Sequence, residues 1–162
     1  METVTSYVGV GSNLGDALHN VNAALAALHH LPQTQLHSHS SLFRSAPIDA
    51  SGDDFVNAVA RVETQLSADS LLAELQKIEL SFGRERPFRN APRTLDLDLL
   101  LFGELKISTD KLVVPHPRMT TRAFVLLPLL ELDAEAFIPG QGLASRYVQG
   151  LGDQVIHPMP KN

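Results

Sequence analysis

The chain alternates between runs with a period of two and runs with a helical period. Apolar residues at every second position predict strands over Tyr7–Val10, Gln35–Arg44, Phe55–Thr64, a run within residues 93–102 and a short segment at Lys106–Ile107. Apolar residues three or four positions apart predict helices over Asp16–Leu31, from the N-cap Ser67 to Phe82, and over Thr121–Leu132. This order predicts an α+β fold with helices on one face of a mostly antiparallel sheet, and we expect a ferredoxin-like core.

The same periodicity predicts which side chains face the core. The buried stripes of the first two helices are Leu18, Val21, Leu25, Leu28 and Leu71, Leu75, Ile78, Phe82. In the strand Phe55–Thr64, one face carries Val56, Ala58, Ala60 and Val62, and the other carries Phe55, Asn57, Val59 and Arg61. In the last long strand, Leu95, Leu97, Leu99 and Leu101 share one face, so Asp96 and Asp98 project together from the other. From residue 139 onward the sequence shows no clear helical or strand pattern.

Composition narrows the class of protein. With 162 residues and 44% apolar content, residues 1–162 are expected to form one domain with a substantial core. The net charge of −5 argues against a protein that coats nucleic acid or an anionic membrane. There is no cysteine, no apolar run of membrane-spanning length and no basic leader, so we expect a cytoplasmic protein.

Asp96 and Asp98 are the first candidates for chemistry. Two carboxylates on one strand face repel each other, and a divalent cation would compensate them. Magnesium takes one or two protein carboxylates together with water and substrate phosphates. The alternative is an edge strand whose polar face is turned to water.

Basic residues are concentrated just before this strand. Nine of the thirteen Lys and Arg residues lie between Lys77 and Arg122, and Arg84, Arg86, Arg89 and Arg93 fall within ten positions. Guanidinium groups match phosphate oxygens in geometry, although a solvated basic loop is the simpler alternative. Next to the paired aspartates, these arginines indicate a magnesium-bound polyphosphate. The chain has no P-loop motif, so a nucleotide site here would be of another kind.

Residues 89–100, RNAPRTLDLDLL, resemble the signature of the 6-hydroxymethyl-7,8-dihydropterin pyrophosphokinase family at every defined position. Further blocks of the chain are similar to the family in the same order: Val10–Leu14, Phe43–Ile48, Phe55–Ala58, Gln76–Glu79 with Gly83–Arg84, Val114–Pro117 and Arg122–Phe124. One departure is that the chain has no tryptophan, whereas the family often carries one in the arginine-rich loop.

The resemblance implies a ferredoxin-like sandwich and an activity. A member of this family moves pyrophosphate from ATP to the hydroxymethyl group of the pterin and releases AMP, in folate biosynthesis. ATP would be the co-substrate, and Asp96 and Asp98 would hold two Mg²⁺ ions. The implied partners are ATP and the pterin, without nucleic acid or membrane, and the chain would act as a monomer.

Site residues follow from the same resemblance. The implied catalytic residues are Arg84, Arg93, Asp96 and Asp98. The implied nucleotide contacts are Gln76, Glu79, Arg84, Arg86, Arg93, Leu99, Lys111, His116, Pro117 and Arg122. The implied pterin contacts are Ser45, Pro47, Ile48, Phe55, Asn57, Asp96 and Phe124.

Two other functions stay open at this point. A different Mg²⁺-dependent nucleotidyltransferase could use paired aspartates on a sheet, and it would release pyrophosphate instead of AMP. A non-catalytic ferredoxin-like ligand-sensing domain would turn over nothing, and it has no need for both the arginines and the aspartate pair.

Overall fold

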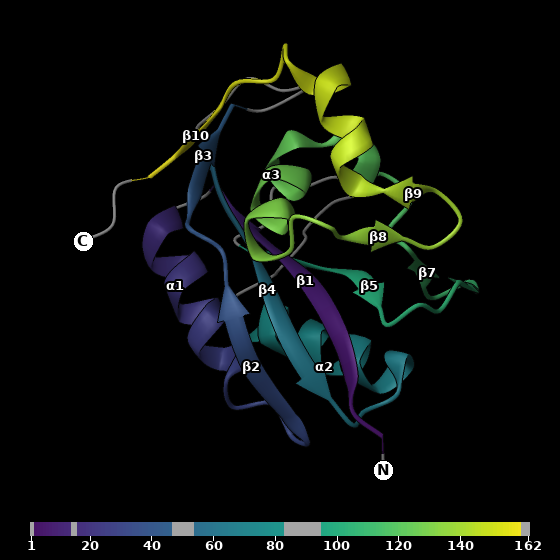
Figure 1. Ribbon diagram of the computed structural model, residues 1–162. Coiled ribbons are helices and arrows are strands. Elements are labelled where there is room, and N and C mark those ends of the chain that lie inside the picture. Colours follow the sequence, from purple (N-terminus) through teal and green to yellow (C-terminus); the bar gives the residue numbers. More distant parts are fainter. Residues whose placement is uncertain (1, 14–15, 47–53, 83–94, 160–162) are drawn as a thin grey trace.

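The computed structural model describes residues 2–13, 16–46, 54–82 and 95–159 (Figure 1). Its main sheet contains β1 (Val4–Ser12), β2 (Thr34–His39), β3 (Phe43–Ser45), β4 (Phe55–Thr64), β5 (Asp96–Phe102) and β10 (Ile156–Pro158). The strand order is β10-β3-β4-β1-β5, with β2 also paired to β4, and these pairings are antiparallel. With α1 (Ala17–Leu28) and α2 (Ala68–Ser81) as crossovers, β1, β2, β4 and β5 form the expected ferredoxin-like core.

Smaller elements follow the core along the chain. They are β6 (Ile107–Ser108), β7 (Val113–Val114), the 3₁₀ helix η1 (Met119–Thr121), α3 (Ala123–Leu132), β8 (Phe137–Ile138), β9 (Gly142–Leu143) and the 3₁₀ helix η2 (Ala144–Leu151). None of the helices in the described ranges has the length and apolar content needed to cross a bilayer.

Helices cover both faces of the sheet, and not one face as expected from the sequence. Buried residues of α1 and α2 pack against Val8, Val10, Val56, Ala58, Ala60 and Val62 in a first core cluster. Buried residues of α3 pack against Tyr7, Val59, Leu100 and Leu101 in a second core cluster. In Figure 1, α3 lies in front of the sheet and α2 behind it. The third helix packs on the opposite face because the sheet also presents buried apolar residues there.

A β-bulge in β5 explains how one strand serves both clusters. Tyr7 pairs with Leu101, whereas the next residue, Val8, pairs with Leu99, so Leu100 is the extra residue. An extra residue inverts the facing of the positions after it. Leu101 therefore joins the second cluster, and the prediction that it shares a face with Leu97 and Leu99 was wrong.

The expected strand over Gln35–Arg44 is two strands, β2 and β3. Ser40 separates them: its N–H donates to the Val59 carbonyl (2.8 Å), and its Oγ accepts from the Val59 N–H (3.0 Å). A buried serine that bonds the neighbouring backbone with its side chain interrupts a regular ladder. The first helix also differs slightly, since Leu18 is 36% exposed and the buried stripe begins at Val21.

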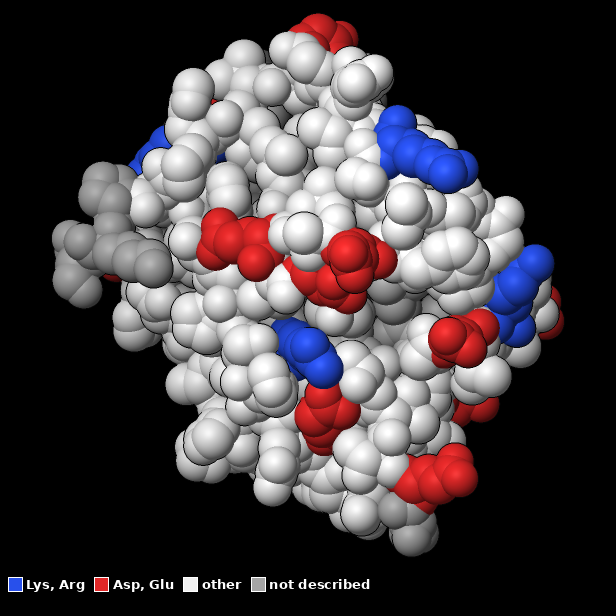
Figure 2. All heavy atoms as spheres, in the orientation of Figure 1, with Lys and Arg blue, Asp and Glu red and all other residues white. Residues whose placement is uncertain are grey.

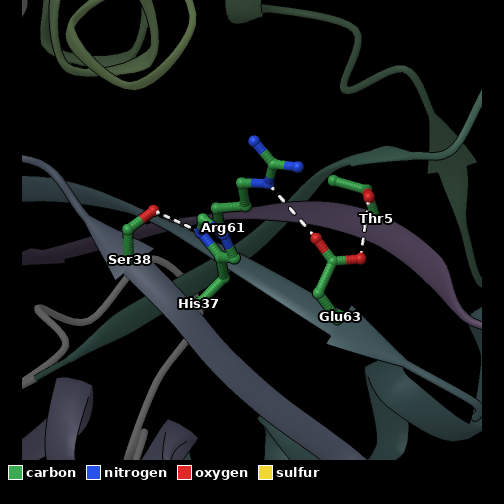
Figure 3. Close-up of polar contacts among 5 residues, drawn as sticks. All are labelled: Thr5, His37, Ser38, Arg61 and Glu63. Carbon is green, nitrogen blue, oxygen red and sulfur yellow. Dashed lines mark hydrogen bonds and ion pairs between the residues drawn. The ribbon is translucent and has the colours of Figure 1, made fainter.

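The sheet face that α3 covers also carries a polar network, at the end of the sheet away from α3 (Figure 3). Arg61 Nε lies 3.3 Å from Glu63 Oε1, and Thr5 Oγ1 donates to Glu63 Oε2 (2.8 Å). Polar side chains at this end need no covering helix. The α3 face is thus polar around Arg61, apolar beneath α3, and open at the other end of β4, near Phe55.

Candidate functional site

A cavity of about 470 Å³ lies where β1, β3, β4 and β5 meet the start of α3. Its lining consists of Gly9, Val10, Gly11, Ser45, Ala46, Phe55, Asn57, Ala58, Asp96, Asp98, Arg118, Thr121, Arg122, Phe124, Val125 and Gln154. Acidic, basic and amide groups therefore converge with aromatic side chains on one concave space, and a concave space with convergent polar groups is the default candidate for a small-molecule site.

Two rows across the sheet form the floor of this cavity. In one row, Gly11 of β1 lies between Asp96 of β5 and Asn57 of β4. In the next row, Gly9 lies between Asp98 and Val59. Figure 1 shows the three strands side by side. Both middle positions lack a side chain, so no side chain of β1 stands between the carboxylates of β5 and the amide of β4.

Asn57 is held in one orientation at the pterin-facing end expected from the sequence. Its side chain is 4% exposed, and its Oδ1 accepts a hydrogen bond from Ser45 Oγ (2.6 Å). A Cβ at Gly11 would come within 2.9 Å of Asn57 Nδ2, so the glycine leaves the room that the amide occupies. A buried, oriented amide of this kind can pair with the hydrogen-bonding edge of a planar ring.

Aromatic and cationic groups line the walls. Phe55 and Phe124 are both half-buried, one on β4 and one in the first turn of α3. The Arg122 guanidinium lies 5.4 Å from the centre of the Phe124 ring, within the range of a cation–π contact. These groups offer stacking surface for a ring and positive charge for an anion.

The two aspartates lie at the other end of the floor. The side chain of Asp98 is 40% exposed, and its Oδ1 is 3.9 Å from His116 Nε2, which is too long for a hydrogen bond. His116 is fixed by its backbone, since its N–H donates to the Leu100 carbonyl (3.0 Å), and its Nδ1 accepts from the Arg118 N–H (3.2 Å). Burial lowers the pKa of His116; Asp98 opposes this shift, whereas Arg122 and Arg118 add to it.

The donor set fits a magnesium ion that is shared with a substrate. Within the described ranges there is no group of three or more His, Cys, Asp or Glu residues that could hold a metal by themselves. Two carboxylates on one strand face, open to the cavity, supply what Mg²⁺ usually takes from a protein, and phosphate and water complete its octahedron. The aspartate pair is therefore suited to a metal–phosphate complex and not to a closed protein cage.

The structure brings seven of the expected site residues to the cavity: Ser45, Phe55, Asn57, Asp96, Asp98, Arg122 and Phe124. His116 lies beside Asp98. Arg84, Arg86, Arg93, Pro47 and Ile48 lie outside the described residues.

The other expected nucleotide contacts lie elsewhere. Gln76, Lys111 and Pro117 are exposed, and the Leu99 side chain is in the first core cluster. Glu79 is 4% exposed, and its Oε2 accepts a hydrogen bond from the Leu97 N–H of β5 (2.9 Å). In this structure Glu79 thus connects α2 to the strand that carries the aspartates.

Sequence reasoning missed Arg118, Thr121 and Gln154 as lining residues. Arg118 directly follows the Pro-His-Pro segment and belongs to the group of basic residues between Lys77 and Arg122. These two facts could have identified it as a candidate site residue. Gln154 lies in the part of the chain without a clear pattern, and no local signal points to it.

The face shown in Figure 2 carries separated basic side chains among acidic ones. Across the described part of this face there is no continuous basic surface of the kind that nucleic-acid-binding proteins present.

Comparisons with known proteins point to one family. The sequence model of 7,8-dihydro-6-hydroxymethylpterin-pyrophosphokinase (HPPK) matches residues 7–134. The chain is 40% identical over 151 residues to the 2-amino-4-hydroxy-6-hydroxymethyldihydropteridine pyrophosphokinase of Haemophilus influenzae, covering 93% of this chain and 94% of the relative. It is 47% identical over 134 residues to the Pseudomonas aeruginosa protein of the same name, covering 82% and 83%.

Solved structures agree on the fold. A crystal structure of a Plasmodium falciparum HPPK-DHPS triple mutant with STZ-DHP superposes with a TM-score of 0.73 at 13% identity. The match covers 92% of this chain and 43% of that chain, so the chain corresponds to less than half of that protein.

Proposed function

The chain belongs to the 7,8-dihydro-6-hydroxymethylpterin-pyrophosphokinase family, and we propose that its cavity of about 470 Å³ is where the two substrates react. The reaction is the transfer of pyrophosphate from ATP to the hydroxymethyl group of 6-hydroxymethyl-7,8-dihydropterin in folate biosynthesis. The chain is therefore an ATP-dependent diphosphotransferase.

The observation that carries the proposal is the row Asp96–Gly11–Asn57 across three strands. It places a carboxylate and an oriented amide on one rigid floor with a glycine between them. Carboxylates suit the metal–phosphate end of one substrate, and the amide suits the ring edge of the other. A site built on paired strands holds such groups more firmly than a site built on loops.

At the pterin end, Asn57 pairs with the ring edge while Ser45 keeps its amide in one orientation. Phe55 and Phe124 contact the two faces of the ring, which is a favourable arrangement for a flat heterocycle. Pro47 and Ile48, which follow Ser45 closely in the sequence, complete this end of the site in our proposal.

At the phosphate end, Asp96 and Asp98 are the residues that would hold Mg²⁺, two ions in our proposal, together with the triphosphate. Bound Mg²⁺ would neutralise phosphate charge and orient the β-phosphoryl group. Arg118 and Arg122 line the same space. In our proposal, Arg84, Arg86 and Arg93, which precede β5 in the sequence, add positive charge. We assign to the nucleotide side Gln76, Glu79, Leu99, Lys111, His116 and Pro117. Those whose side chains lie away from the cavity contact the nucleotide through backbone atoms, or only once ATP has bound.

In the reaction, the hydroxymethyl oxygen forms a bond to the β-phosphorus and loses its proton. The bond between the β-phosphorus and the oxygen bridging to the α-phosphorus breaks, and AMP leaves. The residues contribute by fixing the pterin oxygen in line with that bond and by placing guanidinium groups against the charge that develops. No covalent enzyme intermediate is needed. We also propose that the chain acts as a monomer.

The test is to incubate the protein with Mg²⁺, ATP and 6-hydroxymethyl-7,8-dihydropterin and to quantify nucleotide products. We expect AMP in a one-to-one ratio with the pterin diphosphate, and Asp98→Ala should lower kcat at least about a hundred-fold. Pterin affinity, measured by equilibrium binding, should change far less.

The control is Glu104→Ala, which removes an exposed carboxylate from the turn that follows β5. Release of pyrophosphate in place of AMP would indicate a nucleotidyltransferase, and no turnover by a folded protein would indicate a sensing domain. Near-normal AMP production by Asp98→Ala would refute the role of the aspartate pair.

A further inference from the structure

The side chain of Gln154 bonds to the backbone on both sides of Arg122. Its Oε1 accepts from the Ala123 N–H (2.9 Å), and its Nε2 donates to the Thr121 carbonyl (2.8 Å). One amide group thus bridges the two peptide units that flank Arg122, from a position more than thirty residues later in the chain.

This bridge replaces a missing cap. Arg122 is the N-cap residue of α3, with extended angles (φ −124°, ψ 111°), and it makes no side-chain cap hydrogen bond. The first N–H groups of a helix have no partner within the helix, and an uncapped terminus is less fixed. Gln154 supplies the acceptor for the first of them, at Ala123, and so fixes the backbone from which Arg122 and Phe124 enter the cavity.

Gln154 is itself anchored on the opposite wall. The carbonyl of the next residue, Val155, accepts from the Ala46 N–H (3.1 Å), and Ile156 pairs with Ser45 in the β10–β3 ladder. A smaller cavity of about 200 Å³ beside this link is lined by Ser45, Phe124 and Gln154 among others. Residues 154–156 therefore connect the β3 wall, next to Asn57, with the α3 wall that carries Arg122.

We propose that Gln154 is a positioning residue for pyrophosphoryl transfer: it orients Arg122 and Phe124 and fixes the width of the cavity between β3 and α3. The proposal rests on the function proposed above for this cavity. Gln154 lies outside residues 7–134, the part that the family model matches, so this is a contribution from a region that the family match does not cover.

The first test compares Gln154→Ala with Gln154→Glu. Gln154→Ala removes both hydrogen bonds, and we expect kcat/KM to fall by about five- to thirty-fold, the effect of losing one or two bonds of ordinary strength. Gln154→Glu keeps an acceptor for the Ala123 N–H, where a negative charge at a helix N-terminus is favourable, but it loses the donor to Thr121. Its thermal midpoint should therefore fall less than that of Gln154→Ala, while its KM values for ATP and pterin still rise.

The second test is a double-mutant cycle. If Gln154 acts through Arg122, adding Gln154→Ala to Arg122→Ala should cost less than it does in the wild type, because coupled residues are not additive. The control is Gln149→Ala, an exposed glutamine on η2 that should leave kcat/KM and the thermal midpoint unchanged.

The outcomes separate this inference from the proposed function. If the wild type forms no pterin-dependent AMP, the function assigned to the cavity fails. If the wild type turns over and Gln154→Glu keeps wild-type KM values, Gln154 is only a helix cap and the inference is wrong. Fully additive losses in the cycle would also overturn it.

Discussion

At the scale of single residues, the closest fit in the cavity is between Gly11 and Asn57. These residues face each other across β1 and β4, and the Asn57 amide occupies the volume that a side chain at position 11 would need. Gly9, two positions earlier on the same strand, is less restricted, because a Cβ there would lie 3.5 Å from Leu100, an ordinary contact distance.

Gly11→Ala should therefore impair pterin binding more than Gly9→Ala does. A Cβ at position 11 would displace the Asn57 amide from its bond to Ser45, and losing an oriented buried hydrogen bond of this kind should raise the pterin KM by about ten-fold. Steady-state kinetics with varied pterin at saturating ATP measure this. Equal KM values for the two variants would show that the amide has room to move.

Residue type and family resemblance together identified much of this site. Asp96 and Asp98 could be predicted because two carboxylates on one face of an apolar strand stand out locally, whereas Asn57, Phe55 and Phe124 were predicted from the resemblance to the family. Gln154 could not, because its importance comes from two backbone groups more than thirty residues away. Glu79 was predicted as a nucleotide contact from the resemblance, and its hydrogen bond to the Leu97 N–H is a tertiary property that the helical pattern does not encode.

At the scale of elements, the link between α2 and β5 supports the metal-binding strand. β5 is at an edge of the sheet, and the Glu79 carboxylate satisfies a backbone N–H located between Asp96 and Asp98 in the sequence. An edge strand has one unpaired side, and a buried N–H without a partner is costly. Glu79 therefore helps to hold β5 in place where it carries the aspartates.

Glu79→Ala should destabilise the protein by about 1–3 kcal/mol, since it leaves the Leu97 N–H buried without its acceptor. Glu79→Gln, which retains a carbonyl oxygen, should recover most of the loss. Urea unfolding followed by circular dichroism gives both values. As a control, Glu74→Ala on the same helix removes a surface pair with Lys77 (3.3 Å) and should cost no more than about 1 kcal/mol. Stability of Glu79→Ala equal to wild type would contradict the supporting role.

Strand boundaries show what local pattern can and cannot predict. The strand Phe55–Thr64 was predicted with its correct ends and faces, because it is central and alternates throughout. The bulge at Leu100 was missed, since an inserted residue in a run of leucines leaves no trace in the alternation. β10 was missed because a three-residue edge strand is defined by its partner β3 more than by its own composition.

At the scale of the whole molecule, one sheet serves two core clusters. β1 contributes Val8 and Val10 to the first cluster and Tyr7 to the second. If either cluster unfolds, one face of the shared sheet is exposed to water and the support of the other cluster is lost. We propose on this basis that residues 1–162 form one cooperative domain.

Unfolding should accordingly be a single transition. The chain has two tyrosines and no tryptophan; Tyr7 belongs to the second cluster and Tyr147 packs against it, so tyrosine fluorescence reports on that cluster. Far-ultraviolet circular dichroism reports on all helices, and the two midpoints should coincide. Leu71→Ala, in the first cluster, should lower both midpoints equally and cost about 2–5 kcal/mol. A fluorescence midpoint unaffected by Leu71→Ala would indicate two independent units.

The row Asp96–Gly11–Asn57 also determines a distance within the cavity. Neighbouring strands are separated by about 4.8 Å, so the carboxylate and the amide, two strands apart, start from backbone positions about 10 Å apart. Backbone hydrogen bonds, and not side-chain packing, determine this length. Substitutions in the walls can alter affinity without altering it. A compound that carries both a pterin-like ring and a metal-binding group should therefore bind best with a linker of one particular length.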